Sequence, residues 1–352
     1  MQNIKKPYII AETAFHHEGD EKFLIKLIEE TEKHAVDALK FHVTVDLNAY
    51  MAHDHAAIKV LDPWCFKEDQ WDRILAAVKQ TDIVLLCNDV KSVEYAINCK
   101  FDVKAIEIHA TALNEIFLLD KAAIFPGTVI LGTGGSTLDE IDYAVQYLKE
   151  LGKHDIFLMH GFQNYPTDYK DIKLDRMKKL NQLFDLPVGY ADHTDPSNPL
   201  NEVISCLGLA NGFPVIEKHV TTHFGVKRID AQSAISFDQL DKVAEIAQVI
   251  HQTLGTKDSL VLADAELKYG NTGPMKKAIV AKVDIEKGET IGLDKIAFKR
   301  TNSSSSIKQN ELYKVLNNKA NKAIRRDEII DLSNVDFEFI AQDTSQFKNT
   351  GK

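Results

Sequence analysis

Short apolar segments alternate with longer amphipathic segments over the first two thirds of the chain, and this alternation constrains the fold more than any other feature. Eight apolar runs lie at 7–12, 36–43, 83–88, 103–109, 128–133, 155–160, 187–192 and 213–219. Short apolar runs of this kind, separated by helical patterns, are typical of buried parallel strands. Eight strands that alternate with helices predict a (β/α)8 TIM barrel.

In the segments between the apolar runs, apolar residues recur with the period of an α-helix. Residues 21–34 place apolar side chains, among them Leu24, Leu27 and Ile28, on one face and charged side chains on the other. Similar patterns occur at 67–80, 90–99, 138–151, 171–184, 197–211 and 238–254. An open doubly wound sheet is the rival fold, but the early glycine-rich turn of a dinucleotide-binding sheet is missing. The "GTGG" at 132–135 comes too late and lacks the required spacing.

The pattern changes after residue 257. Residues 277–300 indicate short strands around a Lys287-Gly288 turn, and 301–306 form a polar loop. We therefore expect a catalytic barrel domain at 1–257, a linker at 258–276 and a small second domain at 277–341. The polar residues 342–352 are expected to be frayed.

Composition excludes several classes of protein. The net charge of −10 disfavours a general binder of nucleic acid or anionic membranes, since both attract clustered positive charge. The four scattered cysteines indicate reduced thiols in a cytoplasmic protein. The first residues show no long apolar segment followed by a small-residue cleavage site, so we do not expect secretion by a signal peptide. No run approaches the length of about 20 apolar residues that a membrane helix needs.

Polar groups stand at the ends of most predicted strands. They are Glu12, Lys40, His42, Asn88, Asp89, Glu107, His109, His160, Asp192, His193, Glu217 and His219. The carboxyl ends of barrel strands meet around one pocket, so these groups predict an active site there. Each also has a structural explanation: Glu12 as a helix cap, Lys40 as a surface partner of Asp37, and His160 as a core histidine. His193 and His219 are either core residues or a sparse divalent metal site.

Several of these segments, in this order, resemble motifs of the sialic acid synthase family. They are "IAETAFHHEGD", "LKFHVT", "LMHGFQNYPTDYKDIKL", "VGYADHT" and "IEKHVT", and "AIVAKVDIEKGETI" resembles the start of the family's C-terminal antifreeze-like domain, a β-clip-type fold. The similarity covers residues 7 to about 335. Spore-coat polysaccharide synthases are related members of this group.

The resemblance implies a condensing enzyme of surface polysaccharide biosynthesis. Phosphoenolpyruvate would add to the open-chain aldehyde of an N-acylhexosamine, an amino sugar, and give a nine-carbon 2-keto-3-deoxy sugar acid and phosphate. His193 and His219 would bind Mn2+ or Mg2+, which polarises the aldehyde oxygen. Glu12 would act as general base or orienter, and Lys40 would neutralise the carboxylate or phosphate of the donor.

The resemblance implies further site residues. Tyr165, Glu217 and Asp230 would hold the sugar hydroxyls and a metal-bound water. The remaining substrate-binding candidates are Asn88, His109, Gln163, Asp192 and Arg300. Arg300 lies in the small domain and would reach over the barrel mouth of a partner subunit, which implies a domain-swapped homodimer.

The chain departs from the family pattern where the phosphate is expected. Glu107 stands at the usual lysine position, and Ala110, Gly132 and Ala191 stand where serines are usual. A phosphate dianion requires cations and hydrogen-bond donors, and Glu107 instead adds like charge. Two alternatives stay open: an aldolase- or lyase-type relative that uses another three-carbon donor, such as pyruvate, and a non-catalytic sugar-binding homologue.

Overall fold

A computed structural model describes residues 1, 4–162, 164, 167–255 and 260–336 of the 352-residue chain. The chain divides after Gly255 into two compact units, which are described separately. No helix among these residues is long and apolar enough to cross a membrane. All four cysteines lie in the described part and are free thiols.

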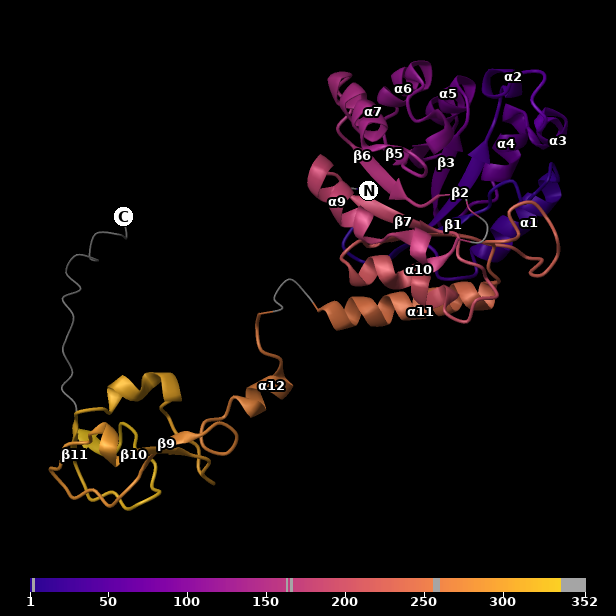
Figure 1. Ribbon diagram of the computed structural model, residues 1–352. Coiled ribbons are helices and arrows are strands. Elements are labelled where there is room, and N and C mark those ends of the chain that lie inside the picture. Colours follow the sequence, from indigo (N-terminus) through magenta and orange to yellow (C-terminus); the bar gives the residue numbers. More distant parts are fainter. Residues whose placement is uncertain (2–3, 163, 165–166, 256–259, 337–352) are drawn as a thin grey trace. The chain divides into compact units, whose positions relative to one another are not determined.

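The first unit is a closed barrel of eight parallel strands in sequence order (Figure 1). The strands are β1 (Tyr8–Glu12), β2 (Ala38–Val43), β3 (Asp82–Cys87), β4 (Val103–Ile108), β5 (Thr128–Gly132), β6 (Ile156–His160), β7 (Val188–Asp192) and β8 (Val215–His219). The barrel closes where β1 pairs with β8, and Tyr8 is the register partner of Val215. Each strand matches one of the eight apolar runs, and only β3 begins outside its run, by one residue, so the predicted TIM barrel is confirmed.

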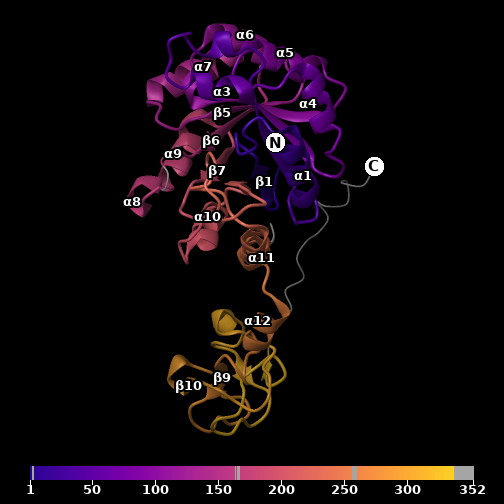
Figure 2. The same ribbon diagram turned by 90° about the vertical axis from the view of Figure 1, so that its right-hand side faces the viewer.

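Helices surround the barrel (Figure 2). They are α1 (Glu21–Thr31), α2 (Leu47–Tyr50), α3 (Ile58–Leu61), η1 (Asp62–Trp64), α4 (Glu68–Leu75), α5 (Val90–Asn98), η2 (Ala110–Ala112), α6 (Ile116–Ala123), α7 (Leu138–Glu150), α8 (Tyr169–Ile172), α9 (Asp175–Phe184), α10 (Asn201–Ala210) and α11 (Phe237–Leu254). The seven predicted helical segments all contain a helix. The sequence reading missed α6, because "IFLLDKAA" is apolar almost all round and shows no polar face.

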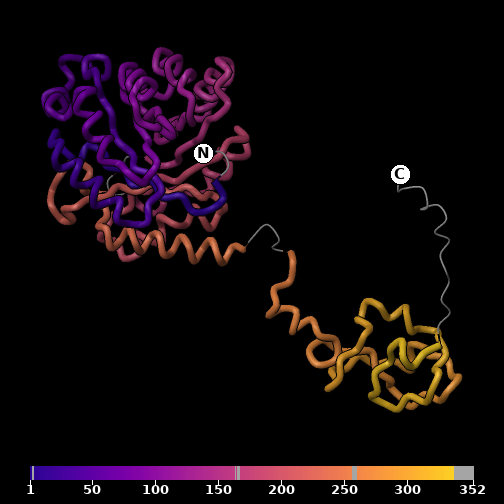
Figure 3. Tube along the Cα trace, turned by 180° about the vertical axis from the view of Figure 1, so that it is seen from behind, coloured from indigo at the N-terminus to yellow at the C-terminus, as the bar shows by residue number. Residues whose placement is uncertain are grey.

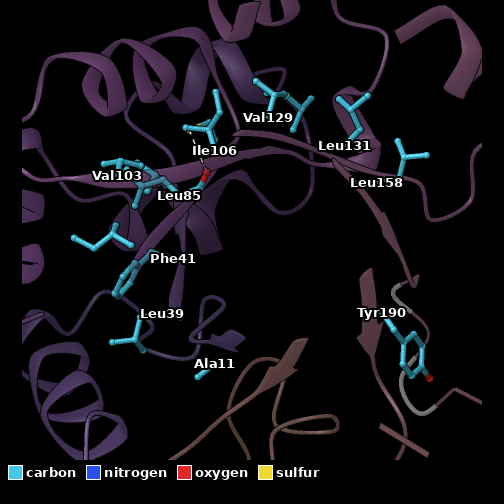
Figure 4. Close-up of a cluster of buried hydrophobic side chains, with 14 of the residues drawn as sticks. Ala11, Leu39, Phe41, Leu85, Val103, Ile106, Val129, Leu131, Leu158 and Tyr190 are labelled. Atoms are coloured by element: carbon cyan, nitrogen blue, oxygen red, sulfur yellow. Dashed lines mark hydrogen bonds between the residues drawn. The ribbon is translucent and has the colours of Figure 1, made fainter. Parts of the chain in front are cut away.

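Two apolar layers build the barrel unit. Side chains on the outer strand faces, among them Leu39, Phe41 and Ile106, form a buried cluster with residues of the surrounding helices (Figure 4). A second cluster fills the interior with one or two residues from each strand, among them Ile10 and Phe157. Because side chains alternate along a strand, the residue two positions after an interior apolar residue also points inward, nearer the mouth.

The second unit is small and has its own core. It contains α12 (Asp264–Tyr269), β9 (Ala278–Ala281), η3 (Leu293–Lys295), β10 (Ile296–Lys299), η4 (Gln309–Lys314), β11 (Lys319–Ala320) and β12 (Val335–Asp336). Antiparallel pairs β9–β10 and β11–β12 pack around buried residues that include Ile279, Ile285 and Ile324. The trace of this unit runs from orange to yellow in Figure 3. The predicted tail at 342–352 lies outside the described residues.

Candidate active site

The strand register brings polar residues from distant parts of the sequence together. Glu12 at the end of β1 is the register partner of Lys40 on β2 and of His219 on β8. Lys40 and His42 are two residues apart on β2, as are Glu217 and His219 on β8, so each pair shares one strand face. Every second side chain of a strand faces the barrel interior. These side chains are apolar in the middle of the barrel and charged at its carboxyl end.

A cavity of about 310 Å³ opens at this carboxyl end, and we call it the mouth. Six of the predicted site residues line it: Glu12, Lys40, His109, His193, Glu217 and His219. His42 and Glu107, two further strand-end groups to which the sequence assigned no catalytic or binding role, line it as well. Small and apolar residues of β5, β6, β7 and the loops that follow complete its wall: Gly132, Gly134, Gly135, Met159, Gly161, Phe162 and Ala191.

Lys40 lies at the centre of a buried ion cluster. Its Nζ is 2.7 Å from Glu217 Oε1, 2.8 Å from Glu107 Oε2 and 3.4 Å from Glu12 Oε1. Each of the four side chains is at most 4% exposed. Burial alone would lower the pKa of Lys40, but the carboxylates of Glu107, Glu12 and Glu217 outweigh it and raise that pKa well above its usual value. Lys40 is therefore an ammonium ion.

The three carboxyl groups differ in their acidity. Burial raises the pKa of Glu217 well above its ordinary value and, although Lys40 opposes this, the negative charges of Glu12 and Glu107 add to it. The pKa of Glu12 is well below its ordinary value, because the attraction of Lys40 and His219 outweighs burial. Burial also raises the pKa of Glu107 against the attraction of Lys40. The cluster thus combines a Glu12 that ionises readily with a Glu217 that holds its proton more strongly than an ordinary glutamate.

Glu12 joins the ion cluster to the histidines of the mouth. Its Oε1 lies 2.6 Å from His42 Nε2, and its Oε2 lies 3.1 Å from His219 Nε2. The structural reading of Glu12 as a helix cap does not hold, because the cap of α1 is Asp20. A carboxylate between two imidazoles and an ammonium can orient the imidazoles and exchange protons with them.

His193 and His219 form the candidate metal pair. Their ring centroids are 5.1 Å apart at an interplanar angle of 71°. Burial, followed by the neighbouring His219, lowers the pKa of His193 to about 3, so its imidazole is neutral at pH 7, as a metal ligand must be. No three His, Cys, Asp or Glu of the described residues are grouped so that they could hold a metal ion. The pair fits a sparse site of two imidazoles, in which substrate or water oxygens provide the other ligands.

A second cavity of about 250 Å³ lies beside the mouth, and we call it the side chamber. His42 and His109 line both cavities. Two predicted substrate-binding residues, Asn88 and Asp230, also line the side chamber. Its remaining lining is mostly aromatic or aliphatic: Phe15, Tyr50, Ala57, Val60, Leu61, Trp64, Thr111 and Ile229. Apolar walls with a few polar groups are typical of pockets for small molecules.

Asp192, also predicted to bind substrate, has its carboxylate directed elsewhere. It accepts hydrogen bonds from Lys218 Nζ at 2.7 Å, from Ser205 of α10 at 2.6 Å and from the Thr194 hydroxyl at 2.6 Å. Asp192 is 1% exposed and does not line the mouth. The attraction of Lys218 outweighs burial and lowers the pKa of Asp192 to about 2. We therefore assign Asp192 to the support of β7 and leave it out of the proposed substrate contacts.

The remaining predicted residues that the structure describes, Arg300 and His160, are not among those that line the mouth. Tyr165 and Gln163 lie outside the described residues. Arg300 follows β10 in the second unit, is exposed, and donates from Nε to the carbonyl oxygen of Pro274 at 2.8 Å. His160, read as either a strand-end group or a core histidine, is buried and hydrogen-bonded to the carbonyl oxygen of Ile172 at 2.8 Å. Its core reading is the one that fits.

Comparisons with known proteins show the family to which the chain belongs. The family model described as NeuB matches residues 27–259, and the SAF domain model matches residues 276–336. The chain belongs to the NeuB family. An uncharacterized protein of Methanocaldococcus jannaschii is 30% identical over 92% of this chain and 93% of its own length. An N,N'-diacetyllegionaminic acid synthase of Campylobacter jejuni is 27% identical over 93% of this chain and 99% of its own length.

A solved structure shares the fold of this NeuB family member. It is a putative spore coat polysaccharide biosynthesis protein E from Chromobacterium violaceum, with a TM-score of 0.80 and 22% identity. The alignment covers 94% of this chain and 100% of the other. The predicted family and its C-terminal domain type are thus both confirmed.

The pairing of Glu107 is the main feature that the sequence did not reveal. The sequence marked Glu107 as a departure from the family pattern and did not identify a cationic partner for it. The structure gives it Lys40, which is 67 residues away on a strand of the same barrel. The sequence did contain one signal for a buried position of Lys40. Lys40 and His42 are two residues apart in an otherwise apolar run, so both side chains point to the same face of the strand, which is the barrel interior.

Proposed function

We propose that this NeuB family member catalyses a carbon–carbon bond-forming condensation at the barrel mouth. A three-carbon donor adds to the open-chain aldehyde of an N-acylhexosamine-type aldose and forms a nine-carbon 2-keto-3-deoxy sugar acid. Phosphoenolpyruvate is the donor that the resemblance implies. The observation that carries the proposal is the convergence of Glu12, Lys40, Glu217 and the imidazoles of His193 and His219 on one buried cavity.

Glu217 is the proton donor in this proposal. An aldehyde oxygen gains negative charge as the new bond forms, and a neutral acid beside it can protonate it. The pKa of Glu217 is raised well above its ordinary value, by burial before all else, so this group keeps its proton to a higher pH than an ordinary glutamate does. Its Oε2 is buried and has no hydrogen-bond partner among the described residues, which is consistent with a group that awaits a ligand atom.

Glu12 and Lys40 provide the opposite charges. Glu12 is ionised and is fixed by His42 and His219, so it can accept a proton from the donor or orient a water. The ammonium of Lys40 stabilises negative charge that develops on the donor. His193 and His219 would hold Mn2+ or Mg2+, which when bound supplies Lewis-acid polarisation of the aldehyde.

The side chamber is suited to the acceptor. It shares His42 and His109 with the mouth, so a ligand that fills both cavities would place one end beside Glu12. Asn88 and Asp230 offer hydrogen bonds to hydroxyl groups, and Trp64 contributes an aromatic wall. An N-acyl sugar has both hydroxyls and apolar faces, so it matches this lining.

The test is product formation by the full-length protein. Incubation with Mn2+, a three-carbon donor and a panel of N-acylhexosamines should give a 2-keto-3-deoxy sugar acid, detected by mass spectrometry. Phosphoenolpyruvate and pyruvate are supplied in separate reactions. Glu217→Gln should lower kcat by about 100-fold or more, the usual contribution of a general acid. Glu245→Gln, on the exposed side of α11, is the matched control. Sugar binding without product from either donor would overturn the proposal and favour a binding protein.

A further inference from the structure

The segment between β8 and α11 carries one wall of the side chamber. Its two ends are joined by a backbone hydrogen bond, in which Thr221 N donates to the carbonyl oxygen of Ile235 at 3.1 Å. Between these ends lie residues 222–234, which we call the chamber loop. Ile229 and Asp230 of the chamber loop line the side chamber. The geometry of this loop therefore decides where the Asp230 carboxylate stands.

The backbone of Asp230 adopts an uncommon conformation. Its φ is 59°, in the left-handed region, which aspartate tolerates better than most residues but still at a cost. Such a conformation persists where the surrounding structure holds it. One contact is local, since Ser233 N donates to the carbonyl oxygen of Asp230 at 3.2 Å. The two preceding residues, Arg228 and Ile229, contact residues 13–20, which follow β1 and which we call the β1 loop.

Arg228 joins the chamber loop to the β1 loop. Its Nε donates to the carbonyl oxygen of His16 at 2.9 Å, and its Nη2 donates to that of His17 at 3.3 Å. The same Nη2 is 3.6 Å from Glu18 Oε2. The guanidinium also lies over the ring of Phe23 in α1, with 4.1 Å from Cζ to the ring centroid. A planar guanidinium with several N–H donors can hold two carbonyl oxygens at once.

The backbone of Ile229 is held by the β1 loop on both sides. Its N–H donates to Glu18 Oε1 at 2.9 Å, and its carbonyl oxygen accepts from His16 Nδ1 at 2.9 Å. Because a carbonyl oxygen only accepts, His16 Nδ1 carries a proton. The other ring nitrogen, Nε2, lies 2.5 Å from Thr221 Oγ1 at the start of the segment. We call the four residues Arg228, Ile229, His16 and Glu18 the clasp.

The β1 loop is itself fixed against the segment that follows β2. The imidazole of His17 stacks on the ring of Phe66, with 4.7 Å between the centroids and 29° between the planes. A Cβ added to Gly19 would lie 2.3 Å from the carbonyl oxygen of Pro63, so the two backbones approach closely. Phe15 of the same loop lines the side chamber. The clasp thus ties the chamber loop to a support that already forms another wall of this cavity.

We propose that Arg228 is a positioning residue for the sugar acceptor. The clasp fixes the chamber loop so that the Asp230 carboxylate can accept hydrogen bonds from the hydroxyls of an N-acylhexosamine in the side chamber. The inference rests on the proposed function, which assigns the side chamber to the acceptor. Arg228 itself lines neither the mouth nor the side chamber as described, so it acts on the acceptor through the residues that follow it.

Arg228→Ala removes the hydrogen bonds to both carbonyl oxygens and the ion contact with Glu18. In the full-length protein with Mn2+, the KM for the N-acylhexosamine that gives product should rise by about tenfold or more, because a displaced Asp230 loses its hydrogen bonds to the sugar. The kcat at saturating sugar and the KM for the donor should change by less than about threefold. Lys227→Ala, at the exposed neighbouring position, is the matched control and should leave all three constants unchanged.

Two conservative variants separate positioning from a loss of folding. Arg228→Lys should recover part of the sugar KM, because an ammonium can still donate to a carbonyl oxygen but lacks the planar fork. Glu18→Gln keeps an oxygen that can accept from Ile229 N and removes only the charge beside Arg228. It should raise the sugar KM by a smaller factor, about threefold. If Arg228→Ala does not fold, an unchanged sugar KM in both conservative variants would overturn the inference.

A double-mutant cycle tests whether Arg228 acts through Asp230. Asp230→Gly removes the carboxylate and places no side chain at the positive φ. In that background, Arg228→Ala should raise the sugar KM by less than about threefold, since two residues that act as one unit are not additive. A tenfold further rise would show that Arg228 acts independently of Asp230 and would overturn the inference.

The outcomes also distinguish this inference from the proposed function. Product formation by the unaltered protein, together with an unchanged sugar KM in a folded Arg228→Ala variant, would overturn the inference and leave the condensation intact. A rise in the donor KM that equals the rise in the sugar KM would also overturn it. Absence of product from the unaltered protein with every sugar and both donors would overturn the proposed function, and the inference with it.

Discussion

The buried ammonium of Lys40 shows how single residues set the chemistry of the mouth. A charge in the barrel interior is tolerated because three carboxyl groups surround it. The carboxylates also depend on Lys40, because a buried negative charge without the ammonium would destabilise the folded state. Stability and function are therefore tied to the same four side chains, and a change at one of them alters the protonation of the others.

Lys40→Met should leave this cluster without its cation. We expect the free energy of unfolding to fall by about 3–5 kcal/mol, the usual result when one partner of a buried ion pair is removed. Urea unfolding followed by circular dichroism measures it. Lys242→Met, which removes an exposed partner of Glu245, should change stability by less than about 1 kcal/mol. Similar losses for the two variants would contradict the buried cluster.

The high pKa of Glu217 makes stability depend on pH. The folded state holds this proton above the ordinary pKa of 4.5, while the unfolded chain releases it. Its contribution is therefore complete below pH 4.5 and is lost as the pH rises towards the pKa in the folded state. Glu217→Gln should flatten the fall in unfolding free energy as the pH rises above 4.5. Urea titrations across this range test it; an unchanged slope would show that Glu217 is already ionised.

The sequence predicts which polar residues lie at strand ends, because the neighbouring residues in the chain mark each strand. It does not predict their contacts with residues that are distant in the sequence. The sequence marked Glu12, Lys40, Glu217 and His219 as strand-end groups, because each lies at or near the end of an apolar run. It gave no partners, because the Lys40–Glu107 contact depends on how strands meet across a closed barrel. For a related reason, the sequence did not reveal that the Asp192 carboxylate points away from the mouth. Adjacent strand residues face opposite ways, so Ala191 lines the mouth while Asp192 faces α10.

At the scale of elements, Asp192 fastens the end of β7 to its neighbours. Its carboxylate accepts hydrogen bonds from Lys218 of β8 and Ser205 of α10. Asp192 directly precedes His193 in the chain. Backbone packing adds a second constraint, because a side chain on Gly161 would collide with the carbonyl oxygen of Ala191. The position of His193 is thus set by groups that do not reach the mouth themselves.

Asp192→Asn should loosen this part of the barrel. The amide cannot balance the buried charge of Lys218, so we expect a loss of about 3–5 kcal/mol in unfolding free energy. Ser205→Ala removes one hydrogen bond from the same carboxylate and should cost about 1 kcal/mol. Thermal and urea unfolding of the two variants give the comparison. Equal effects would mean that the Asp192–Lys218 ion pair contributes little to stability.

Element prediction depended on the contrast between apolar and polar positions. The eight strands and seven of the surrounding helices were found because each run differs sharply from its flanks. Helix α6 was missed because its sequence lacks that contrast, with Phe117 exposed on the outside of the helix and Leu118 and Leu119 buried. The barrel could still be predicted, because β4 and β5 were both recognised and the number of strands was complete.

At the scale of the whole molecule, the proposed role of Arg300 links the SAF domain to catalysis. The resemblance places it over the mouth of a partner's barrel, where a guanidinium would contact the sugar. Arg300→Ala should raise the KM for the N-acylhexosamine without lowering stability, since Arg300 is exposed and its side chain donates to Pro274 O. Steady-state kinetics and thermal unfolding measure both effects. An unchanged KM would argue against the lid role.

Mixing two variants tests whether the SAF domain acts on its own barrel or on that of a partner. Glu217→Gln disables the barrel and Arg300→Ala disables the lid. If the domains are swapped, a mixed dimer has one site that combines the intact barrel of one chain with the intact lid of the other. Unfolding and refolding an equal mixture should then restore about a quarter of the sites at subsaturating sugar. If each lid serves its own barrel, every site in the mixture carries one defect, and activity stays at the average of the separate variants.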